Sequence, residues 1–393
     1  MTERLLLLTP FFHPEPIGTG KYNSFLAMAL VREGVAVDVL CFHPIYPDWR
    51  PRRSNEGLSG MRIYRGGAWM RFPRNTLLRR AVLECGFLFF MLRHVRRIRR
   101  HSLIVAVLPP MLYLPFVHLI ASRHARVTAI VHDLQGVMAG VGNGRVRRTV
   151  VRLVRRLEAA VFGCAHRVFT LSEAMATFLS ASYGIAPSKV TVCWPFVSID
   201  TRYSTNHLER QFAADKKHIV YAGALGDKQN PYELIAFFQN LAARRKDVVC
   251  HVFSGGPIFK ALRRRAANGH RLMFHDFIPE QQLYELYLRS HIQVIPEKPG
   301  FANGAFPSKL PNLLAAGVPV LYIGQRDSDV CRMIHGTDAG LCAEGWDFAN
   351  LNDLVDQLLL EGDKRSHADR RQAFNASLKS CFSIDPLVKE LVG

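Results

Sequence analysis

Two glycines near the start of the chain are candidates for contact with a phosphate. Gly18 and Gly20 lie in a loop rich in proline and glycine, Pro10–Lys21. A short apolar run, Leu5–Thr9, precedes this loop, and a helical segment, Tyr22–Glu33, is expected to follow it. Glycine lets the backbone approach a ligand closely, and the N–H groups at a helix N-terminus suit an anion. The loop therefore predicts a nucleotide-type ligand, although a GxG of this kind is equally compatible with a tight turn that binds nothing.

Three loops in the second half carry residues suited to the same chemistry. Lys228 follows the apolar run His218–Gly223, Gly255 and Gly256 follow a second apolar run, and Lys309 stands at the start of a helical segment. A leaving diphosphate needs backbone donors and fixed cations. Lys309 and the adjoining helix N-terminus could hold one phosphate between them. A lysine at a helix start is usually only solvated, but three such loops after successive strands predict a phosphate-binding domain.

Apolar runs alternate with helical segments in both halves of the chain. This alternation predicts βαβ units with parallel sheets, and so an α/β fold of two Rossmann-like, doubly wound domains that face a central cleft. A polar stretch, Ile199–Lys217, separates the halves, and we place the domains at 1–199 and 200–375, with a helical tail at 376–393. The expected strands are Leu5–Thr9, Val35–Phe42, Leu103–Leu108, Val127–Val131, Val168–Leu171, His218–Gly223, Val248–Ser254, Leu272–Phe274, Gln293–Ile295 and Pro319–Ile323, and the later helices are Tyr232–Arg245, Phe259–Ala267 and Pro386–Val392.

Composition narrows the class of protein. The chain has 393 residues, about half of them apolar, which excludes intrinsic disorder and allows two cores. Its eight cysteines form no CxxC pair and have no flanking histidine at zinc-ligand spacing, so buried free thiols in a reducing compartment are expected. Leu5–Thr9 is too short for the apolar region of a signal peptide, and Ala81–Leu92 is too short to span a bilayer.

The formal charge of +19 is concentrated in the first half. Residues 1–200 hold 27 Lys/Arg against 11 Asp/Glu, whereas residues 201–393 hold 24 against 21. Two segments, Leu77–Arg100 and Val146–Val161, combine apolar residues with arginines, as helices at an anionic membrane surface do. The alternatives are that the apolar stripes pack on the sheet beneath solvated arginines, or that the basic half meets nucleic acid. The arginines are Arg93, Arg96, Arg97, Arg99 and Arg100 in the first segment, and Arg147, Arg148, Arg152, Arg155 and Arg156 in the second.

Four segments resemble the retaining glycosyltransferases of family 4. They read HPEPIGTGKYNSFLAMALVREG…HPIYPDW, CAHRVFTLSEAM, YAGALGDKQN and PSKLPNLLAAGVPV, and they occur in order over nearly the whole chain. They are most similar to the bacterial branch that builds exopolysaccharides, including the colanic acid type of enzyme. The resemblance implies a GT-B fold, with the acceptor on the N-terminal domain and the sugar nucleotide mainly on the C-terminal one.

The resemblance also implies roles for individual residues. Lys228 and Lys309 would contact the donor diphosphate, Gly18 and Gly20 would belong to a loop that closes over the donor, and His132 would orient the reacting sugar or the acceptor. His132 could instead be a strand-end histidine bonded to a backbone carbonyl. The implied catalytic residues are His132, Asp133, Lys228 and Lys309, and the implied donor-binding residues are Gly18, Gly20, Gly223, Lys228, Gly255, Gly256, Ser308, Lys309 and Asn312.

The chain departs from the family in its Glu-x7-Glu motif. Asn312 takes the place of the second glutamate, where it would hold a donor hydroxyl, and Gly304 takes the place of the first. Asn303 or Glu297 could substitute for the missing carboxylate. The sequence Asp327-Ser328-Asp329 spells the DxD of metal-dependent transferases, but two carboxylates alone are weak evidence for a metal. We expect no metal and no cofactor.

The expected activity is transfer of a hexose or deoxyhexose from a nucleoside diphosphate sugar to an undecaprenyl diphosphate-linked oligosaccharide. The product would be bacterial exopolysaccharide or a related surface polysaccharide, and the enzyme would lie on the cytoplasmic face of the plasma membrane. Two alternatives remain: a non-catalytic relative that assists another transferase, suggested by Gly304, and a basic nucleic-acid-binding protein. The chain has no helix-turn-helix, RNP or zinc-finger signature, which argues against the latter.

Overall fold

The chain folds into two compact units. The computed structural model describes residues 4–15, 17–134, 145–201, 206–266, 271–300 and 304–393. The N-terminal unit contains Met1–Pro195, Asn303–Phe306 and Ile384–Gly393, and the C-terminal unit contains Phe196–Ala302 and Pro307–Ser383. The last helix, in the sequence region we placed in a separate tail, therefore belongs to the N-terminal unit.

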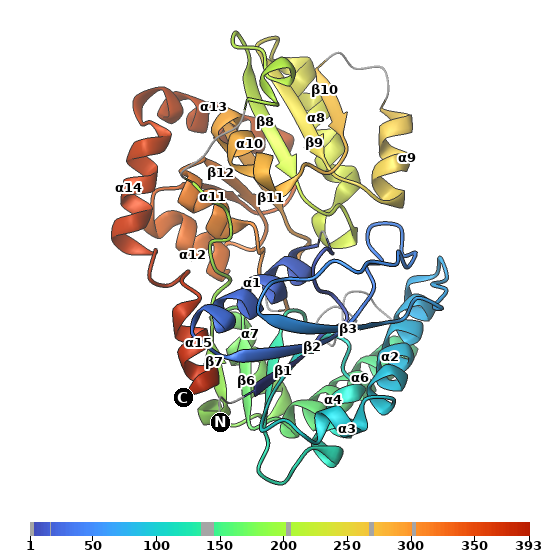
Figure 1. Cartoon of the computed structure of the whole chain (residues 1–393). Coiled ribbons are helices and arrows are strands. Elements are labelled where there is room, and N and C mark those ends of the chain that lie inside the picture. Colours follow the sequence, from blue (N-terminus) through green and yellow to red (C-terminus); the bar gives the residue numbers. More distant parts are fainter. Residues whose placement is uncertain (1–3, 16, 135–144, 202–205, 267–270, 301–303) are drawn as a thin grey trace. The chain divides into compact units, whose positions relative to one another are not determined.

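A seven-stranded parallel sheet forms the centre of the N-terminal unit, in the order β3-β2-β1-β4-β5-β6-β7 (Figure 1). Its central strands are continuous apolar runs such as LLLL and LIVAVL, as expected of parallel strands that are buried on both faces. The order reverses between β1 and β4, which defines a switch point. The strands are β1 (Arg4–Leu8), β2 (Ala36–Phe42), β3 (Met61–Gly66), β4 (Leu103–Leu108), β5 (Arg126–Val131), β6 (Arg167–Thr170) and β7 (Val190–Val192).

Helices connect these strands, and one of them comes from the far end of the chain. Helix α15 packs against α1, and Arg167 forms an ion pair with Glu390 of α15. Helix α2 packs against α4, and α6 against α7. The helices are α1 (Gly18–Arg32), α2 (Thr76–Leu92), α3 (Val95–Ile98), α4 (Tyr113–Ile120), α6 (Arg145–Gly163), α7 (Glu173–Tyr183), the short η1 (Pro187–Lys189) and α15 (Asp385–Val392).

The C-terminal unit has a six-stranded parallel sheet in the order β10-β9-β8-β11-β12-β13, with its reversal between β8 and β11 (Figure 1). Apolar side chains of β8, β9 and β11 pack with those of α8 and α13 in one core. The strands are β8 (Lys217–Ala222), β9 (Val248–Phe253), β10 (Leu272–His275), β11 (Ile292–Pro296), β12 (Val320–Ile323) and β13 (Gly340–Ala343). The helices are η2 (Glu209–Gln211), η3 (Asp227–Gln229), α8 (Pro231–Arg244), α9 (Pro257–Arg265), η4 (Glu280–Gln282), α10 (Leu283–Arg289), α11 (Leu310–Ala316), α12 (Asp329–Gly336), α13 (Phe348–Lys364) and α14 (His367–Ser377).

The predicted α/β fold with two parallel sheets is confirmed, and each predicted strand lies within one residue of an observed one. The sequence did not reveal β3, β7 and β13, each of which is the edge strand of its sheet. Edge strands have an exposed side and so need no continuous apolar run. Over the residues described, no helix combines the length and apolarity needed to cross a membrane.

Candidate functional site

The switch point of the C-terminal unit gathers the residues suited to a diphosphate. Ligands of open α/β sheets bind beyond the carboxyl ends of the strands where the strand order reverses, here β8 and β11. Gly223 directly follows β8 and has φ +144°, a conformation that favours glycine. Lys228 lies in η3 after this turn, and its carbonyl accepts a hydrogen bond from the N–H of Lys298 at 2.8 Å. The loops that follow β8 and β11 are therefore joined beside Lys228.

Lys309 points its ammonium group into the same switch point. Its Nζ donates to the carbonyl of Ala222 on β8 at 3.3 Å and to that of Val294 on β11 at 2.9 Å. The same nitrogen lies 4.4 Å from the centre of the Tyr221 ring. Part of the residue is exposed, but burial of the ammonium lowers the pKa of Lys309 to about 7. Lys309 is the N-cap of α11, and both hydrogen bonds run to the strands instead of the helix terminus.

Glu297 provides a carboxylate whose charge interacts with that of Lys228. It follows β11, and its carboxylate accepts a hydrogen bond from the Tyr322 hydroxyl on β12. Burial raises the pKa of Glu297 to about 7, against the opposing effects of the Tyr322 hydrogen bond and the charge of Lys228. Glu297 also lines a cavity of about 530 Å³ beyond the ends of β11, β12 and β13, with Arg326 and Trp346 among its walls. Of the two substitutes suggested for the missing glutamate, Glu297 stands at the switch point, and Asn303 lies outside the described residues.

Two of the remaining predicted donor contacts have structural requirements for glycine. Gly256 adopts φ +93° at the N-cap of α9. A Cβ on Gly255 would lie 2.5 Å from the ring of Phe277, so packing alone requires glycine there. Ser308 is exposed just before Lys309.

Asn312 is engaged elsewhere. Its Oδ1 accepts hydrogen bonds from the N–H of Ser198 at 2.7 Å and of Ile199 at 3.3 Å, and its Nδ2 donates to the Ser198 hydroxyl at 3.0 Å. The side chain is buried and its amide is used on both sides. In this structure Asn312 therefore fixes the start of the C-terminal unit, and its contact with a donor hydroxyl stays a prediction.

The segment around Gly18 and Gly20 in the N-terminal unit, which we expected to be a loop, is helical. Gly18 and Gly20 form the first turn of α1, which begins four residues earlier than expected. A Cβ on Gly20 would lie 2.8 Å from the Cβ of Glu15, so this glycine lets α1 pack against the preceding segment. Two further side chains of α1 bond to that segment. Asn23 donates through Nδ2 to the Phe11 carbonyl at 3.0 Å, and Ser24 accepts a hydrogen bond at Oγ from the His13 N–H at 2.9 Å. Gly20 thus serves helix packing, and the segment before it is held to α1, while contact of Gly18 and Gly20 with a donor stays a prediction.

His132 and Asp133 lie together beyond β5. His132 is 8% exposed and packs edge-on against the Tyr22 ring, with 4.7 Å between ring centres. Its Nε2 is buried and has no hydrogen-bond partner among the residues described. This nitrogen is therefore not bonded to a backbone carbonyl, as the alternative interpretation of a strand-end histidine required. Burial lowers the pKa of His132 to about 4, against the charge of Asp133, so the imidazole is neutral near pH 7. Asp133 pairs with Ala305 in an antiparallel bridge.

Glu15 is a buried carboxylate that the sequence reading did not single out. Its two oxygens accept hydrogen bonds from the N–H of Ile45 at 2.9 Å and of Tyr46 at 2.7 Å. Burial raises the pKa of Glu15 to about 7, although both hydrogen bonds and the charge of Arg52 oppose the shift. Glu15 therefore joins the HPEP and HPIYPDW segments. The sequence feature that could have drawn attention to it is its place between two prolines in HPEP.

The DxD sequence offers no pair of open carboxylates. Asp329 is buried and forms an ion pair with Arg332, which also donates to the backbone carbonyl of Asp327 at 2.7 Å. Ser328, between the two aspartates, caps α12 by accepting a hydrogen bond from the Cys331 N–H at 3.2 Å. These residues begin a helix and hold its first turn.

The first basic segment forms two helices, α2 and α3, instead of one. Helix α2 has a second apolar face besides the one in the core, since Leu78, Ala81, Cys85, Phe89 and Leu92 recur at helical spacing and are all exposed. Large apolar side chains near its two ends are also exposed, Leu77 to 79% and Trp69 to 68%. The exposed arginines around this face are Arg71, Arg74, Arg93 and Arg96.

In the second basic segment, α6 spans Arg145–Gly163, close to the predicted helix. Leu157 of α6 is exposed, Val161 is buried, and Arg155 lies over the Phe178 ring of α7 at 5.5 Å. Among the α6 side chains that the structure describes, some therefore pack inward, as expected if the apolar stripe packs within the domain, and others face solvent.

Comparison with known families agrees with this architecture. Residues 18–193 match the family described as "Glycosyl transferase 4-like domain", and residues 204–373 match "Glycosyl transferases group 1". The two matches fall on the two units in turn. The chain belongs to the glycosyltransferases with the GT-B fold, and the predicted enzyme class is confirmed.

Among individual proteins, the chain is similar to the "Putative colanic acid biosynthesis glycosyl transferase WcaI" of Escherichia coli (strain K12). The two are 27% identical over 335 residues, which cover 78% of this chain and 79% of the other. Sucrose-phosphate synthase from Thermosynechococcus elongatus has the same fold, with a TM-score of 0.76 at 16% identity over 99% of this chain and 97% of that one. WaaG, a glycosyltransferase involved in lipopolysaccharide biosynthesis, gives a TM-score of 0.72 at 13% identity over 99% of this chain and 100% of that one.

Proposed function

We propose that this glycosyltransferase moves a sugar from a nucleoside diphosphate sugar to a lipid-linked oligosaccharide, with retention of configuration and without a metal. The observation that carries the proposal is the convergence of Lys228, Lys309 and Glu297 on the switch point between β8 and β11. Two lysines and a carboxylate at the ends of neighbouring strands suit a donor that combines an anionic diphosphate with hydroxyl groups.

In this proposal, Lys309 gains a stronger partner when the donor binds. Its ammonium now donates to two neutral carbonyls, those of Ala222 and Val294. A diphosphate brought to the switch point would supply full negative charge, which restores the pKa of the lysine and favours the charged form. Lys228 would share that charge, and the two would stabilise the leaving nucleoside diphosphate when the bond to the sugar breaks.

His132 would act as a neutral hydrogen-bonding group. Because burial keeps the imidazole uncharged near pH 7, its unpartnered Nε2 can bond a sugar hydroxyl but is no source of a full positive charge. Asp133, next to it, would help to orient the acceptor. Retention by front-face attack needs little more than positioning, since the leaving phosphate can take the proton of the acceptor hydroxyl.

The acceptor class is proposed from the relatives. WcaI is named for colanic acid biosynthesis and WaaG is described as acting in lipopolysaccharide biosynthesis. We propose that the present enzyme extends a bacterial exopolysaccharide or related surface polysaccharide on an undecaprenyl diphosphate carrier. Such an acceptor stands on the cytoplasmic leaflet, where a transferase must meet it.

The exposed face of α2 is the proposed contact with that leaflet. Its apolar residues, Leu78, Phe89 and Leu92 among them, would enter the interface, while the surrounding arginines meet anionic headgroups. A net charge of +19, mostly in the first half of the chain, acts in the same direction. This arrangement would place the N-terminal unit beside the lipid-linked acceptor.

Two assays test the proposal. Purified enzyme is incubated with a panel of nucleotide sugars and a bacterial lipid extract, and release of free nucleotide is measured. Lys228→Ala and Lys309→Ala should each reduce turnover by about one to three orders of magnitude. Wild-type rates in both variants would refute the site assignment.

The membrane contact is tested by flotation on liposomes that contain phosphatidylglycerol. Phe89→Glu should reduce binding by about tenfold or more, because a charge replaces an inserted ring. Leu360→Glu is the matched control, since Leu360 is 64% exposed but lies on α13 of the C-terminal unit. Equal loss in both variants, or tight binding to DNA without liposome binding, would contradict the proposal.

A further inference from the structure

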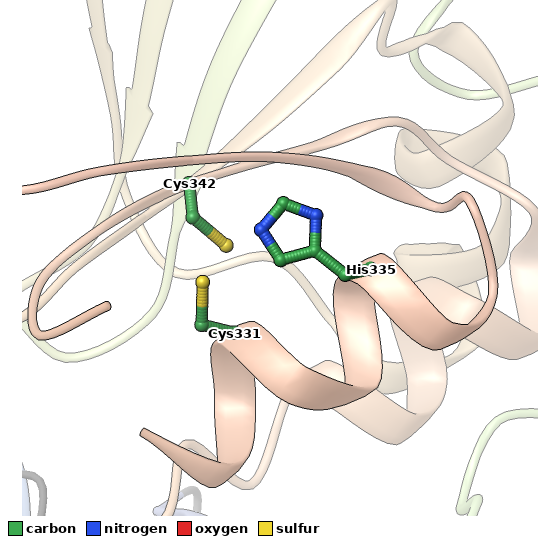
Figure 2. Close-up of side chains that lie close together, drawn as sticks. All are labelled: Cys331, His335 and Cys342. Atoms are coloured by element: carbon green, nitrogen blue, oxygen red, sulfur yellow. The ribbon is translucent and has the colours of Figure 1, made fainter. Parts of the chain in front are cut away.

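Three side chains with soft donor atoms meet at the edge of the C-terminal sheet. Cys331 and His335 lie on α12, and Cys342 lies on the edge strand β13. One ligand atom from each, the two Sγ atoms and a ring nitrogen, lie within 4.8 Å of one another. Figure 2 shows the sulfur atoms facing each other, with the imidazole ring beside them. The sequence reading that no histidine stands at ligand spacing from a cysteine is therefore wrong.

The local structure explains why these three meet. Cys331 and His335 are four residues apart in a helix, which places them on one face. The Ser328 cap fixes the first turn of that helix through the Cys331 N–H. The register of β13 fixes the position of the third donor, Cys342, because this residue pairs with Tyr322 of β12. Helix α12 packs directly on β13, so two rigid elements hold all three groups.

We propose that Cys331, His335 and Cys342 form a binding site for Zn²⁺. Two thiolates and an imidazole are a donor set that zinc prefers, and the fourth position of a tetrahedral site would be taken by water. Bond lengths of about 2.3 Å to sulfur and about 2.0 Å to nitrogen place tetrahedral ligands about 3.5–3.8 Å apart. The ligand atoms, which lie within 4.8 Å of one another, need to approach by at most about 1.3 Å to reach that geometry, and the exposed His335 is free to turn.

The charges of this site balance on binding. Zn²⁺ displaces one proton from each thiol, both protons pass to solvent, and the resulting centre of two thiolates, one neutral imidazole and one dication is uncharged. Cys331 and Cys342 are largely shielded, whereas His335 is exposed and gives the ion a route from solvent.

The bound ion would fasten α12 to the edge strand. Arg326 and Asp327, just before α12, and Glu344, just after β13, line the cavity of about 530 Å³ beyond the ends of β11, β12 and β13. A cross-link between α12 and β13 would therefore hold two walls of that cavity in place. This site is independent of the proposed transferase activity, because its residues take no part in the lysine site.

The test uses the full-length protein, reduced with a phosphine and freed of metal by dialysis against a chelator. Zn²⁺ competition with a chromogenic chelator should give one equivalent bound, with release of about two protons in weakly buffered solution. Co²⁺ substituted for Zn²⁺ should show absorption bands from cobalt–thiolate charge transfer. Each of three substitutions should weaken Zn²⁺ binding by more than about 100-fold: Cys331→Ser, His335→Ala and Cys342→Ser. A loss of this size exceeds that expected for a residue that only supports a metal ligand.

The matched controls are Cys85→Ser and Cys381→Ser, which remove exposed cysteines elsewhere and should leave binding unchanged. Zn²⁺ should also raise the melting temperature of the wild type and of both controls, but not of the three site variants. The proposal is overturned if the reduced protein binds less than one equivalent, if the cobalt spectrum lacks thiolate bands, or if the site variants retain wild-type affinity.

Discussion

The proposed contact of Lys309 with the donor diphosphate predicts that donor affinity depends on pH. In the free protein, burial lowers this pKa to about 7, against an ordinary value of 10.5. A bound diphosphate interacts with the ammonium and not with the neutral amine, so binding raises the pKa again. Nucleotide binding is then linked to uptake of a proton, and affinity must fall as the pH rises above about 7.

The size of the effect follows from the fraction of Lys309 that carries its proton. With a pKa of about 7, that fraction is about one half at pH 7 and about 3% at pH 8.5. If only the ammonium form binds, the dissociation constant rises about 16-fold over this range, or about 1.6 kcal/mol. This is an upper value, because part of Lys309 is exposed to solvent. The diphosphate itself becomes more anionic as pH rises, which would strengthen binding.

The assay is isothermal titration calorimetry of UDP and GDP at a series of pH values. The wild type should lose affinity above about pH 7 and take up protons on binding, as seen in the dependence of the heat on the buffer. Lys309→Met cannot titrate, so it should bind more weakly with no such loss. Lys246→Met removes an exposed lysine of the same unit and should behave as the wild type. A wild-type curve parallel to that of Lys309→Met would refute the assignment.

Three further substitutions separate chemistry from packing. His132→Ala should lower kcat by about 10- to 1,000-fold and change nucleotide affinity by less than about threefold, measured by steady-state kinetics beside calorimetry. In Gly20→Ala the new Cβ would lie 2.8 Å from Glu15, so this variant should lower the free energy of unfolding in urea by about 1–3 kcal/mol. Gly362→Ala is the control: its Cβ would have nothing within 4 Å, so the protein's stability should stay the same or rise. Asn312→Ala leaves two backbone N–H groups without their acceptor and should lower the free energy of unfolding by about 1–3 kcal/mol. Its nucleotide affinity should stay within about threefold of that of the wild type. A large loss of nucleotide affinity in a stable variant would instead support the predicted contact of Asn312 with a donor hydroxyl.

The central strands could be predicted because burial on both faces leaves a continuous apolar run. Three of the four edge strands could not be predicted; for example, β3 carries two arginines in MRIYRG and β13 begins with Gly340. At Gly340 a Cβ would lie 1.9 Å from the Val320 carbonyl, a constraint that exists only once β12 is in place. The position of α1 was misjudged because glycines read as a loop, whereas Gly20 is required where the helix meets Glu15.

The sequence predicted where the candidate site residues lie in the fold, but not their hydrogen-bond partners. The loops of Lys228 and Lys309 follow from strand ends, but the hydrogen bonds of Lys309 to β8 and β11 depend on the sheet order. Asn312 was read from a family motif, yet its amide is used by the chain near Ser198, far away in sequence. The Cys331 and Cys342 pairing likewise required the register of an edge strand that the sequence did not reveal.

The central claim is tested most directly by identifying the product. Purified enzyme, a panel of nucleoside diphosphate sugars and lipid-linked oligosaccharides from a bacterial extract are combined, and the lipid product is analysed by mass spectrometry and by NMR of the new linkage. We expect one donor to extend the lipid-linked glycan by one sugar whose anomeric configuration matches that of the donor, and Lys309→Ala to reduce this product by about one to three orders of magnitude. Inversion of configuration, or no extension of any lipid-linked acceptor while a free sugar is glycosylated efficiently, would contradict the central claim.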